Sequence, residues 1–364
     1  MKRNLNILSF FLSILFFIAS LSFSEEKVQY LKKVGEIKEG FSSERENFFI
    51  KITGLCCDDE GNLYVADSGW NKIFKFDSNG KFLMSFGREG QGPGEFMGQR
   101  MSNHLKISFG NDGKLYVNDP GNSRISVFTK EGKFLKSHKT PPFTYDTPVV
   151  NSRGDIYLLS KSGIKAIDCY DSNFKYKGSL LDMEEHLQFP FGKPFPSYNY
   201  LRIPNEFELM KSITKDDNLV ALSNYSLKIF IFGQNGEKIN EFDITEKEFI
   251  EDFKVRLEKL REENKKNKDR IKGYEPSNLL LPFKLLTAND KLKVIYMRSD
   301  RTFVIYEWSD TGKLFKKYYI KGEPFISQSC FNEIGFIYTL IDKGMRIGIY
   351  KVVKNYLKIK EKEV

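Results

Sequence analysis

The chain has 364 residues, of which 40% are hydrophobic and 29% charged, so it can bury a large core and is not a disordered protein. The formal net charge is +9, but the basic residues are spread along the chain rather than clustered, which argues against a nucleic-acid partner. The four cysteines are too few for a disulfide scaffold and lack the spacing of a zinc site.

The N-terminus has the pattern of a secretory signal. Two basic residues precede an apolar stretch over residues 7–23, and small residues suit cleavage after Ser24. We therefore predict a signal peptide over residues 1–24 and an exported domain over residues 25–364, located in the periplasm, on the cell surface or outside the cell. The alternative is an uncleaved anchor, the one case in which we expect membrane association.

An internal repeat dominates the rest of the chain. Residues 61–87 and 113–139 align without a gap, and in both copies two turn glycines lie 19 residues apart. Each copy contains three short apolar strands, and another apolar run precedes it, so a unit has four strands joined by tight turns. Six copies begin at Gly61, Gly113, Gly154, Asp217, Asp290 and Gly335.

A single four-stranded sheet cannot bury both of its faces, whereas six sheets packed around an axis can. The repeat therefore predicts an all-β protein, a six-bladed β-propeller. The spare strand Val28–Ile37 is expected to close the ring by pairing with the last blade beside Arg346–Val353. The competing candidate for this role is the C-terminal run Tyr356–Glu361.

The segment GNLYVADSGWNKIFKFDSNGKFLMSFGREGQGPGEF, residues Gly61–Phe96, resembles the NHL repeat. It resembles more closely the secreted bacterial 6-bladed beta-propeller family, whose members carry the phrase GxGPGEF between blades. The match is strong over residues 53–140, moderate to Asp243 and faint beyond it. The resemblance implies a six-bladed propeller. It implies little about activity, because many members have no assigned function and NHL propellers serve mostly as interaction modules.

Three unusual crossovers between blades are expected on one face of the ring. Residues 88–99 are rich in Gly and Pro but lack the Lys-Ser/Thr of a phosphate loop, so we interpret them as a shaped connection. Residues 187–206 are rich in aromatic residues and proline. They form either a lid for a peptide or sugar, or local core; the candidate binding residues are Phe189, Phe191, Phe195, Tyr198 and Tyr200.

The third crossover, about residues 245–272, is predicted to be a helical insertion between blades 4 and 5. Phe249, Phe253, Leu257 and Leu260 are spaced to share one face of the helix. That face either docks on the ring or leaves the helix as a partner-binding arm.

Loops between the second and third strands of a blade are expected on the same face as the crossovers. They offer polar side chains that either bind a ligand or bond the nearby backbone, as Asp and Asn do in turns. These candidates are Asp67, Asn71, Lys72, Asp119, Asn122 and Arg124.

The three histidines do not occupy equivalent positions. His104 lies near an inner strand and is a further candidate binding residue, His138 ends an outer strand, and His186 lies in a crossover. We therefore predict no metal site and no cofactor, and keep a divalent cation in the central channel as the alternative. Cys56 and Cys330 hold equivalent positions in neighbouring blades, where they form either a disulfide or two buried thiols.

These features predict a non-enzymatic binding or scaffold propeller outside the cytoplasm. Its partner would be a protein, a peptide or a carbohydrate docking on the face that carries the crossovers. The alternative function is a metal-dependent lyase or hydrolase acting at the central channel.

Overall fold

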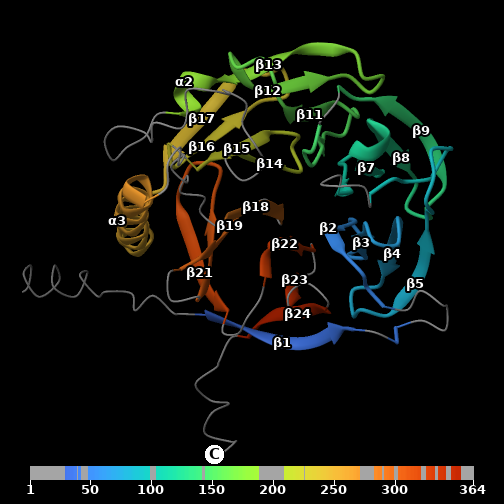
Figure 1. The fold of residues 1–364 in the computed structure, drawn as a ribbon, viewed down its shortest axis with the longest axis horizontal. Coiled ribbons are helices and arrows are strands. Elements are labelled where there is room, and N and C mark those ends of the chain that lie inside the picture. The colour runs from blue at the N-terminus through green and yellow to red at the C-terminus, as the bar shows by residue number, and fades with distance from the viewer. Residues whose placement is uncertain are drawn as a thin grey trace, which may run out of the picture.

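The structure is a computed structural model, and it shows six four-stranded units arranged in a ring (Figure 1). The predicted signal peptide, the aromatic segment with all five of its candidate residues, and the competing C-terminal run lie outside the residues that the structure describes. The described residues are 29–38, 40–41, 48–98, 104–141, 144–187, 209–224, 226–270, 283–288, 291–298, 302–320, 325–332, 335–341 and 346–353.

Each blade is an antiparallel sheet whose strands follow one another from the channel outward. Blade one contains β2 (Ile52–Cys57), β3 (Leu63–Asp67), β4 (Lys72–Phe76) and β5 (Phe82–Phe86). Blade two contains β6 (Lys106–Phe109), β7 (Leu115–Asp119), β8 (Arg124–Phe128) and β9 (Phe134–Lys139), with a 3-10 turn η1 (Pro120–Asn122). Blade three contains β10 (Val149–Val150), β11 (Ile156–Leu159), β12 (Lys165–Tyr170) and β13 (Tyr176–Asp182), followed by α2 (Met183–His186).

The later blades repeat this order. Blade four contains β14 (Leu209–Ile213), β15 (Leu219–Ser223), β16 (Lys228–Phe232) and β17 (Lys238–Asp243). Blade five contains β18 (Phe283–Ala288), β19 (Lys291–Met297), β20 (Phe303–Trp308) and β21 (Leu314–Ile320). Blade six contains β22 (Phe325–Phe331), β23 (Phe336–Ile341) and β24 (Arg346–Val353).

The fourth strand of blade six comes from the other end of the chain. Strand β1 (Gln29–Ile37) pairs antiparallel with β24, which confirms the predicted closure by the N-terminal strand (Figure 1). Its first residues also run parallel to Tyr318–Ile320 of β21. Strand β1 therefore joins blades five and six into one eight-stranded sheet and leaves fewer exposed strand edges.

Burial within a blade follows the position of the strand. The second strands β3 and β7 are buried at every residue, as expected for sheets covered on both faces. The outer strand β9 instead alternates between half-buried and exposed residues. The turn between the first two strands requires a left-handed residue, which is Gly61 (φ 85°) in blade one and Asp217 (φ 61°) in blade four.

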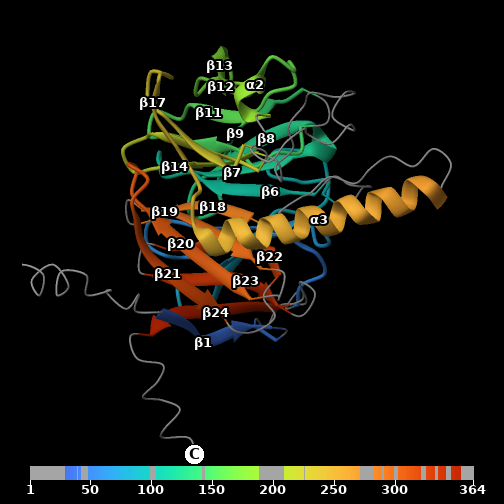
Figure 2. The ribbon, with the colours of Figure 1, turned by 90° about the vertical axis from the view of Figure 1, so that its left-hand side faces the viewer.

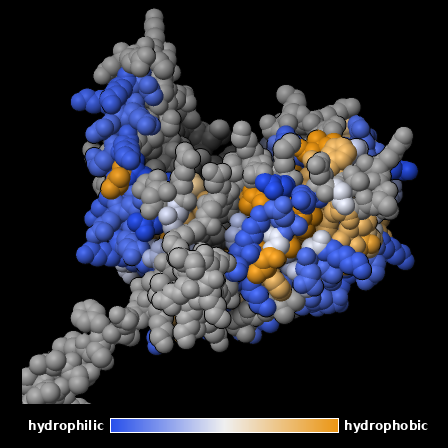
Figure 3. Space-filling model, turned by 90° about the horizontal axis from the view of Figure 1, so that it is seen from below, coloured by the Kyte–Doolittle hydropathy of each residue, from blue (hydrophilic) through white to orange (hydrophobic). Residues whose placement is uncertain are grey.

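Helix α3 (Lys247–Arg270) follows β17 and precedes β18 in the chain. Its side chains Phe249, Phe253 and Leu257 are buried in the same apolar cluster as Trp308 of β20. The helix extends away from the disc (Figure 2), and the space-filling view shows it as a mainly hydrophilic column (Figure 3). Among the helices that the structure describes, none has the length and apolar content to cross a bilayer.

Candidate functional site

The GPGEF crossover is held by side chains from blade two. The Arg124 guanidinium donates to the carbonyl oxygens of Gln91, Gly92 and Glu95 at 2.7–2.8 Å. Within the crossover, the Glu95 carboxylate accepts a hydrogen bond from the Gly92 N–H at 2.7 Å and pairs with Arg88. The crossover is thus a built connection, and Arg124 satisfies the carbonyl groups that its irregular backbone leaves unpaired.

The Asp67 carboxylate likewise bonds backbone groups, here in the segment that leads into β2 and in its own loop. Its side chain is fully buried and accepts hydrogen bonds from four backbone N–H groups at 2.7–3.2 Å. The donors are Ile50, Lys51, Gly69 and Trp70. A carboxylate with this many backbone donors is a structural organiser of the loop.

Asn71, Asp119 and Asn122 complete this arrangement. The Asn71 side chain accepts from the Gly98 N–H at 2.7 Å, and the Asp119 carboxylate accepts from the Met97 N–H at 3.2 Å. Asn122 donates to Asp119 at 2.6 Å and also donates to the carbonyl oxygen of Gly90. Desolvation raises the pKa of Asp119 above its ordinary value. The structure thus gives backbone partners to five of the polar candidates on this face, and Lys72 opens β4 beside Asp67.

The histidines lie apart. His186 of α2 is buried with its Nδ1 2.9 Å from Ser223 Oγ, and desolvation lowers its pKa to about 3. His138 of β9 stacks on Phe174, and His104 precedes the inner strand β6. In the described parts of the chain, no group of three His, Cys, Asp or Glu side chains is placed to hold a metal ion.

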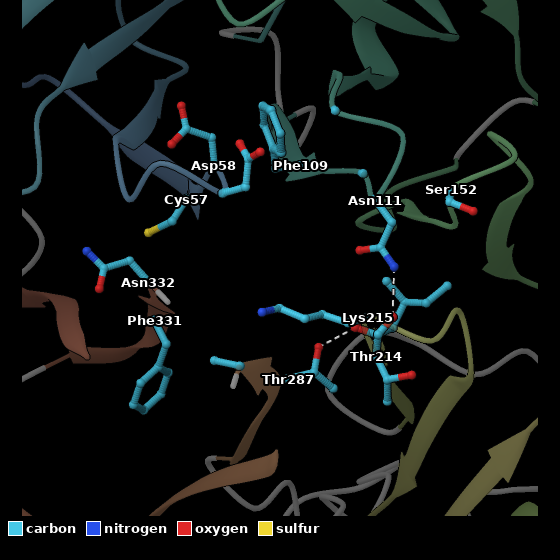
Figure 4. Close-up of a pocket in the computed structure, with 15 residues that line it drawn as sticks. Cys57, Asp58, Phe109, Asn111, Ser152, Thr214, Lys215, Thr287, Phe331 and Asn332 are labelled. Atoms are coloured by element: carbon cyan, nitrogen blue, oxygen red, sulfur yellow. Dashed lines mark hydrogen bonds between the residues drawn. The ribbon is translucent and has the colours of Figure 1, made fainter. Parts of the chain in front are cut away.

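A cavity of about 440 Å³ opens at the opposite end of the ring, where the turns between first and second strands lie (Figure 4). All six blades contribute to its wall, mostly through residues at or just after the end of each inner strand. This volume is within the usual range for a small-molecule site. The lining residues are Cys57, Asp58, Asp59, Phe109, Gly110, Asn111, Gly113, Ser152, Ile213, Thr214, Lys215, Thr287, Ala288, Phe331 and Asn332.

The rim of this cavity is tied together across blades two, three and four. Asn111 Nδ2 donates to the Thr214 carbonyl oxygen at 2.7 Å and to the Asp217 carboxylate at 2.8 Å. The same carboxylate accepts hydrogen bonds from the backbone N–H and the hydroxyl of Ser152. Thr287 of blade five donates to the Ile213 carbonyl oxygen of blade four (Figure 4). Hydrogen bonds thus fix the wall in place before any ligand arrives.

Two carboxylates and one lysine side chain lie at the cavity. Asp58 accepts hydrogen bonds from the Asn62 backbone and the Tyr64 hydroxyl, and Asp59 forms an ion pair with Lys130 at 2.6 Å. Both carboxylates are therefore already compensated. The exposed Lys215 side chain crosses the mouth toward the wall formed by blades one and six (Figure 4). Around it lie the partly buried apolar side chains Phe109, Ile213 and Phe331.

Sequence reasoning did not find this cavity. The lining residues come from similar positions of the repeat in each blade but differ in residue type. They meet at one place only because the ring of six blades closes. The one available signal was the position directly after each inner strand, which the repeat alignment defines in every blade.

The cysteine that faces Cys330 is Cys57 rather than Cys56. The two sulfur atoms lie 3.1 Å apart, in the apolar cluster between blades one and six. Cys56 and Cys330 do hold equivalent positions, opposite Tyr64 and Tyr338, but equivalent side chains point the same way around the ring. Cys56 consequently packs toward blade two, and the adjacent residue points back to blade six.

Residues 44–101 match the sequence profile of a family described as 6-bladed beta-propeller. The chain is similar to that family in sequence and in fold. The matched residues cover blade one and its crossover, the part of the propeller in which the GPGEF phrase is held by Arg124.

Two solved structures have similar architecture. A member of the duf4221 family from Bacteroides vulgatus has a TM-score of 0.54 at 8% identity, covering 90% of this chain and 99% of the other. A "Putative exported protein" from Bacteroides fragilis has a TM-score of 0.47 at 15% identity, covering 79% of this chain and 75% of the other. The first similarity shows the propeller fold alone, and the second is too weak to add to it.

A curated relative matches about a quarter of this chain. Peptidyl-glycine alpha-amidating monooxygenase B from Xenopus laevis is 36% identical over 85 residues, which are 23% of this chain. The match spans only 10% of the relative's own length, so it says nothing about the larger part of that protein.

Proposed function

We propose that this protein is an extracytoplasmic binding propeller that holds a small carboxylic acid with an apolar body at the mouth of its channel. The observation that carries the proposal is the cavity to which all six blades contribute, with Lys215 across it. The ammonium group suits a carboxylate, and the side chains of Phe109, Ile213 and Phe331 suit an apolar group. Export is supported by the signal-like pattern of residues 1–24.

The proposal moves the site away from the crossover face. Asp67, Asp119 and Arg124 on that face already bond the crossover backbone, so a ligand would have to compete with the fold for them. The hydrogen bonds of the hairpin turns are instead largely closed within the backbone, as in Gly113 N–H to Gly110 O at 3.0 Å. The cavity on this face is therefore lined by residues of turns whose backbone is already closed by its own hydrogen bonds.

Helix α3 has a structural part in this proposal. We interpret it as an insertion between blades four and five that braces blade five. Its stripe of Phe249, Phe253 and Leu257 is buried, and Arg256 donates to the Met297 carbonyl oxygen of β19. These contacts favour a structural role for the helix over a role as a partner-binding arm.

The test compares phenylacetate with the neutral phenylacetamide. Both probes have the same apolar body, but only phenylacetate offers a carboxylate to Lys215. We expect Lys215→Met to weaken phenylacetate binding about fivefold to tenfold in calorimetry and to change phenylacetamide binding less than twofold. The matched control is Lys81→Met, which removes an exposed lysine outside the cavity lining. Equal binding of phenylacetate by wild type and Lys215→Met would refute the site.

The metal-dependent lyase or hydrolase that the sequence left as the alternative is the second candidate, because the 85-residue match is to an enzyme, the amidating monooxygenase. Metal analysis of the purified full chain separates the two functions. A stoichiometric divalent metal whose removal by a chelator abolishes a measured lyase activity would favour the enzyme. Phenylacetate binding that is unchanged by the chelator would favour the binding propeller.

A further inference from the structure

We propose that Cys57 and Cys330 form a disulfide bond that locks the first blade to the last at the channel. The bond would be a redox-dependent modification at the seam where the ring closes. It goes beyond the binding function and does not depend on it.

The positions of the two sulfur atoms support this proposal. The inner strands β2 and β22 lie side by side, and they bring the two sulfur atoms within 3.1 Å although 273 residues separate them in the chain. Cys330 is buried with 3% of its surface exposed, while Cys57 is partly exposed and lines the cavity. Cys57 is therefore the member of the pair that lies nearer to a reagent in the cavity.

Hydrogen bonds from side chains of blade six to backbone carbonyl groups of blade one also cross the seam, and strand β1 closes the ring at the opposite edge of the blade. Strand β1 completes blade six at the periphery, where it pairs with β24 over Tyr30–Ile37. At the channel, blades one and six meet through the apolar cluster that includes Leu55, Tyr338 and Cys330. A disulfide there would add a covalent link to a non-covalent interface, so opening of the ring would require more than fraying of β1.

The surroundings of the pair favour the neutral form of the Cys57 thiol. Desolvation raises the pKa of the Cys57 thiol, and the neighbouring Cys330 thiol raises it further, since two thiolates in contact repel each other. Disulfide formation removes both titrating groups from this apolar place. Of the other two cysteines, Cys56 packs toward blade two, and Cys169 lies in the core cluster of blades three and four.

The reaction is a thiol–disulfide exchange with a disulfide oxidant, either glutathione disulfide or an oxidised dithiol protein of the exported compartment. The Cys57 thiolate attacks one sulfur atom of the oxidant, and the other leaves as a thiolate. The Cys330 thiolate then attacks Cys57 Sγ and releases the second thiol. Two S–H bonds are lost from the protein, one S–S bond forms, and the oxidant takes up the two electrons and two protons.

The experiment uses the purified full chain incubated with glutathione disulfide, alkylated and digested without reduction. We expect one linked peptide pair containing Cys57 and Cys330, with a mass lower by two hydrogens than the sum of the free peptides. Because Cys56 shares a peptide with Cys57, variants assign the bond. Cys57→Ser should abolish the linked pair, and Cys56→Ser should keep it.

A second measurement compares thermal unfolding before and after reduction with dithiothreitol. We expect the oxidised wild type and the oxidised Cys56→Ser variant to unfold about 5–10 °C above their reduced forms. Cys57→Ser and Cys330→Ser should show no such difference. Four alkylated cysteines in the oxidant-treated folded protein, or a linked pair that survives in Cys57→Ser, would overturn the proposal. Phenylacetate binding has no part in these readouts, so the two proposals fail independently.

Discussion

The face that carries the crossovers and the face that carries the hairpin turns are built from the same residue types. On the crossover face, Asp67 and Arg124 together bond four N–H groups and three carbonyl groups of the backbone. On the hairpin face, Asn111 and Asp217 bond each other and the neighbouring turns, and Lys215 crosses an open cavity.

The difference lies in what the backbone needs. A crossover such as residues 87–98 is irregular and long. It has an isolated bridge between Glu89 and Phe96 in place of a continuous ladder, and several of its other polar groups are bonded by side chains of the next blade. A hairpin turn closes its own bonds, as in Gly61 N–H to Asp58 O at 3.0 Å. A polar residue on a propeller is therefore available for a ligand only where the backbone does not already use it.

The largest effect that tests this contrast between the two faces is expected for Asp67→Ala. The substitution leaves four N–H groups in a buried place without an acceptor, and we expect the free energy of unfolding to fall by about 3–5 kcal/mol. Urea unfolding at neutral pH measures this loss. Phenylacetate affinity of the remaining folded protein should be unchanged, because the cavity lies on the other face.

The matched variant Asp67→Asn sharpens the result. Its amide keeps one oxygen acceptor but presents N–H₂ to backbone donors, so its loss of stability should fall between those of wild type and Asp67→Ala. If either variant weakened phenylacetate binding at full stability, Asp67 would belong to a ligand site and the contrast between the two faces would be lost.

A second test uses His186, which is buried on the crossover side of the ring. Because the pKa of His186 is about 3 in the folded state and about 6.5 in the unfolded state, only the unfolded state takes up its proton as pH falls. Stability is thus fully present above pH 6.5 and is lost below it. Between pH 7.5 and pH 5, His186 should account for a loss of about 2 kcal/mol.

The measurement is urea unfolding at both pH values for wild type and His186→Asn. The variant keeps an amide donor for Ser223 but has no titrating group, so its loss between the two pH values should be smaller by about 2 kcal/mol. An identical pH dependence in the two proteins would show that the pKa of His186 is the same in the folded and the unfolded state.

The blades could be predicted because each repeats the same turn requirement. Gly61, Gly113 and Gly154 all have positive φ, and Asp217 takes the same conformation in blade four, so a weak repeat still marked the start of a second strand. Closure by β1 was predictable for a related reason, since a blade that ends with β24 lacks one strand.

Side-chain direction and cavities were harder to predict. The repeat alignment put Cys56 and Cys330 at equivalent positions, but facing partners in neighbouring blades come from adjacent positions, which is why Cys57 is the partner. The cavity requires six turns to meet at one axis, and residues as different as Ser152, Thr214 and Asn332 form its wall. No local pattern in the chain records that meeting.

The smallest expected effect concerns Asp217, whose carboxylate ties the rim of the cavity together. Asp217→Gly keeps the left-handed turn but removes the bonds to Asn111 and Ser152, and we expect a loss of about 1–2 kcal/mol and about threefold weaker phenylacetate binding. Asp217→Asn, which tolerates the same φ and keeps one oxygen acceptor, should lose less than about 1 kcal/mol. Calorimetry and urea unfolding of both variants give the two numbers. An unchanged affinity in Asp217→Gly would mean that ligand binding does not depend on these hydrogen bonds. Preorganisation of the cavity wall by Asp217 would then contribute nothing to affinity.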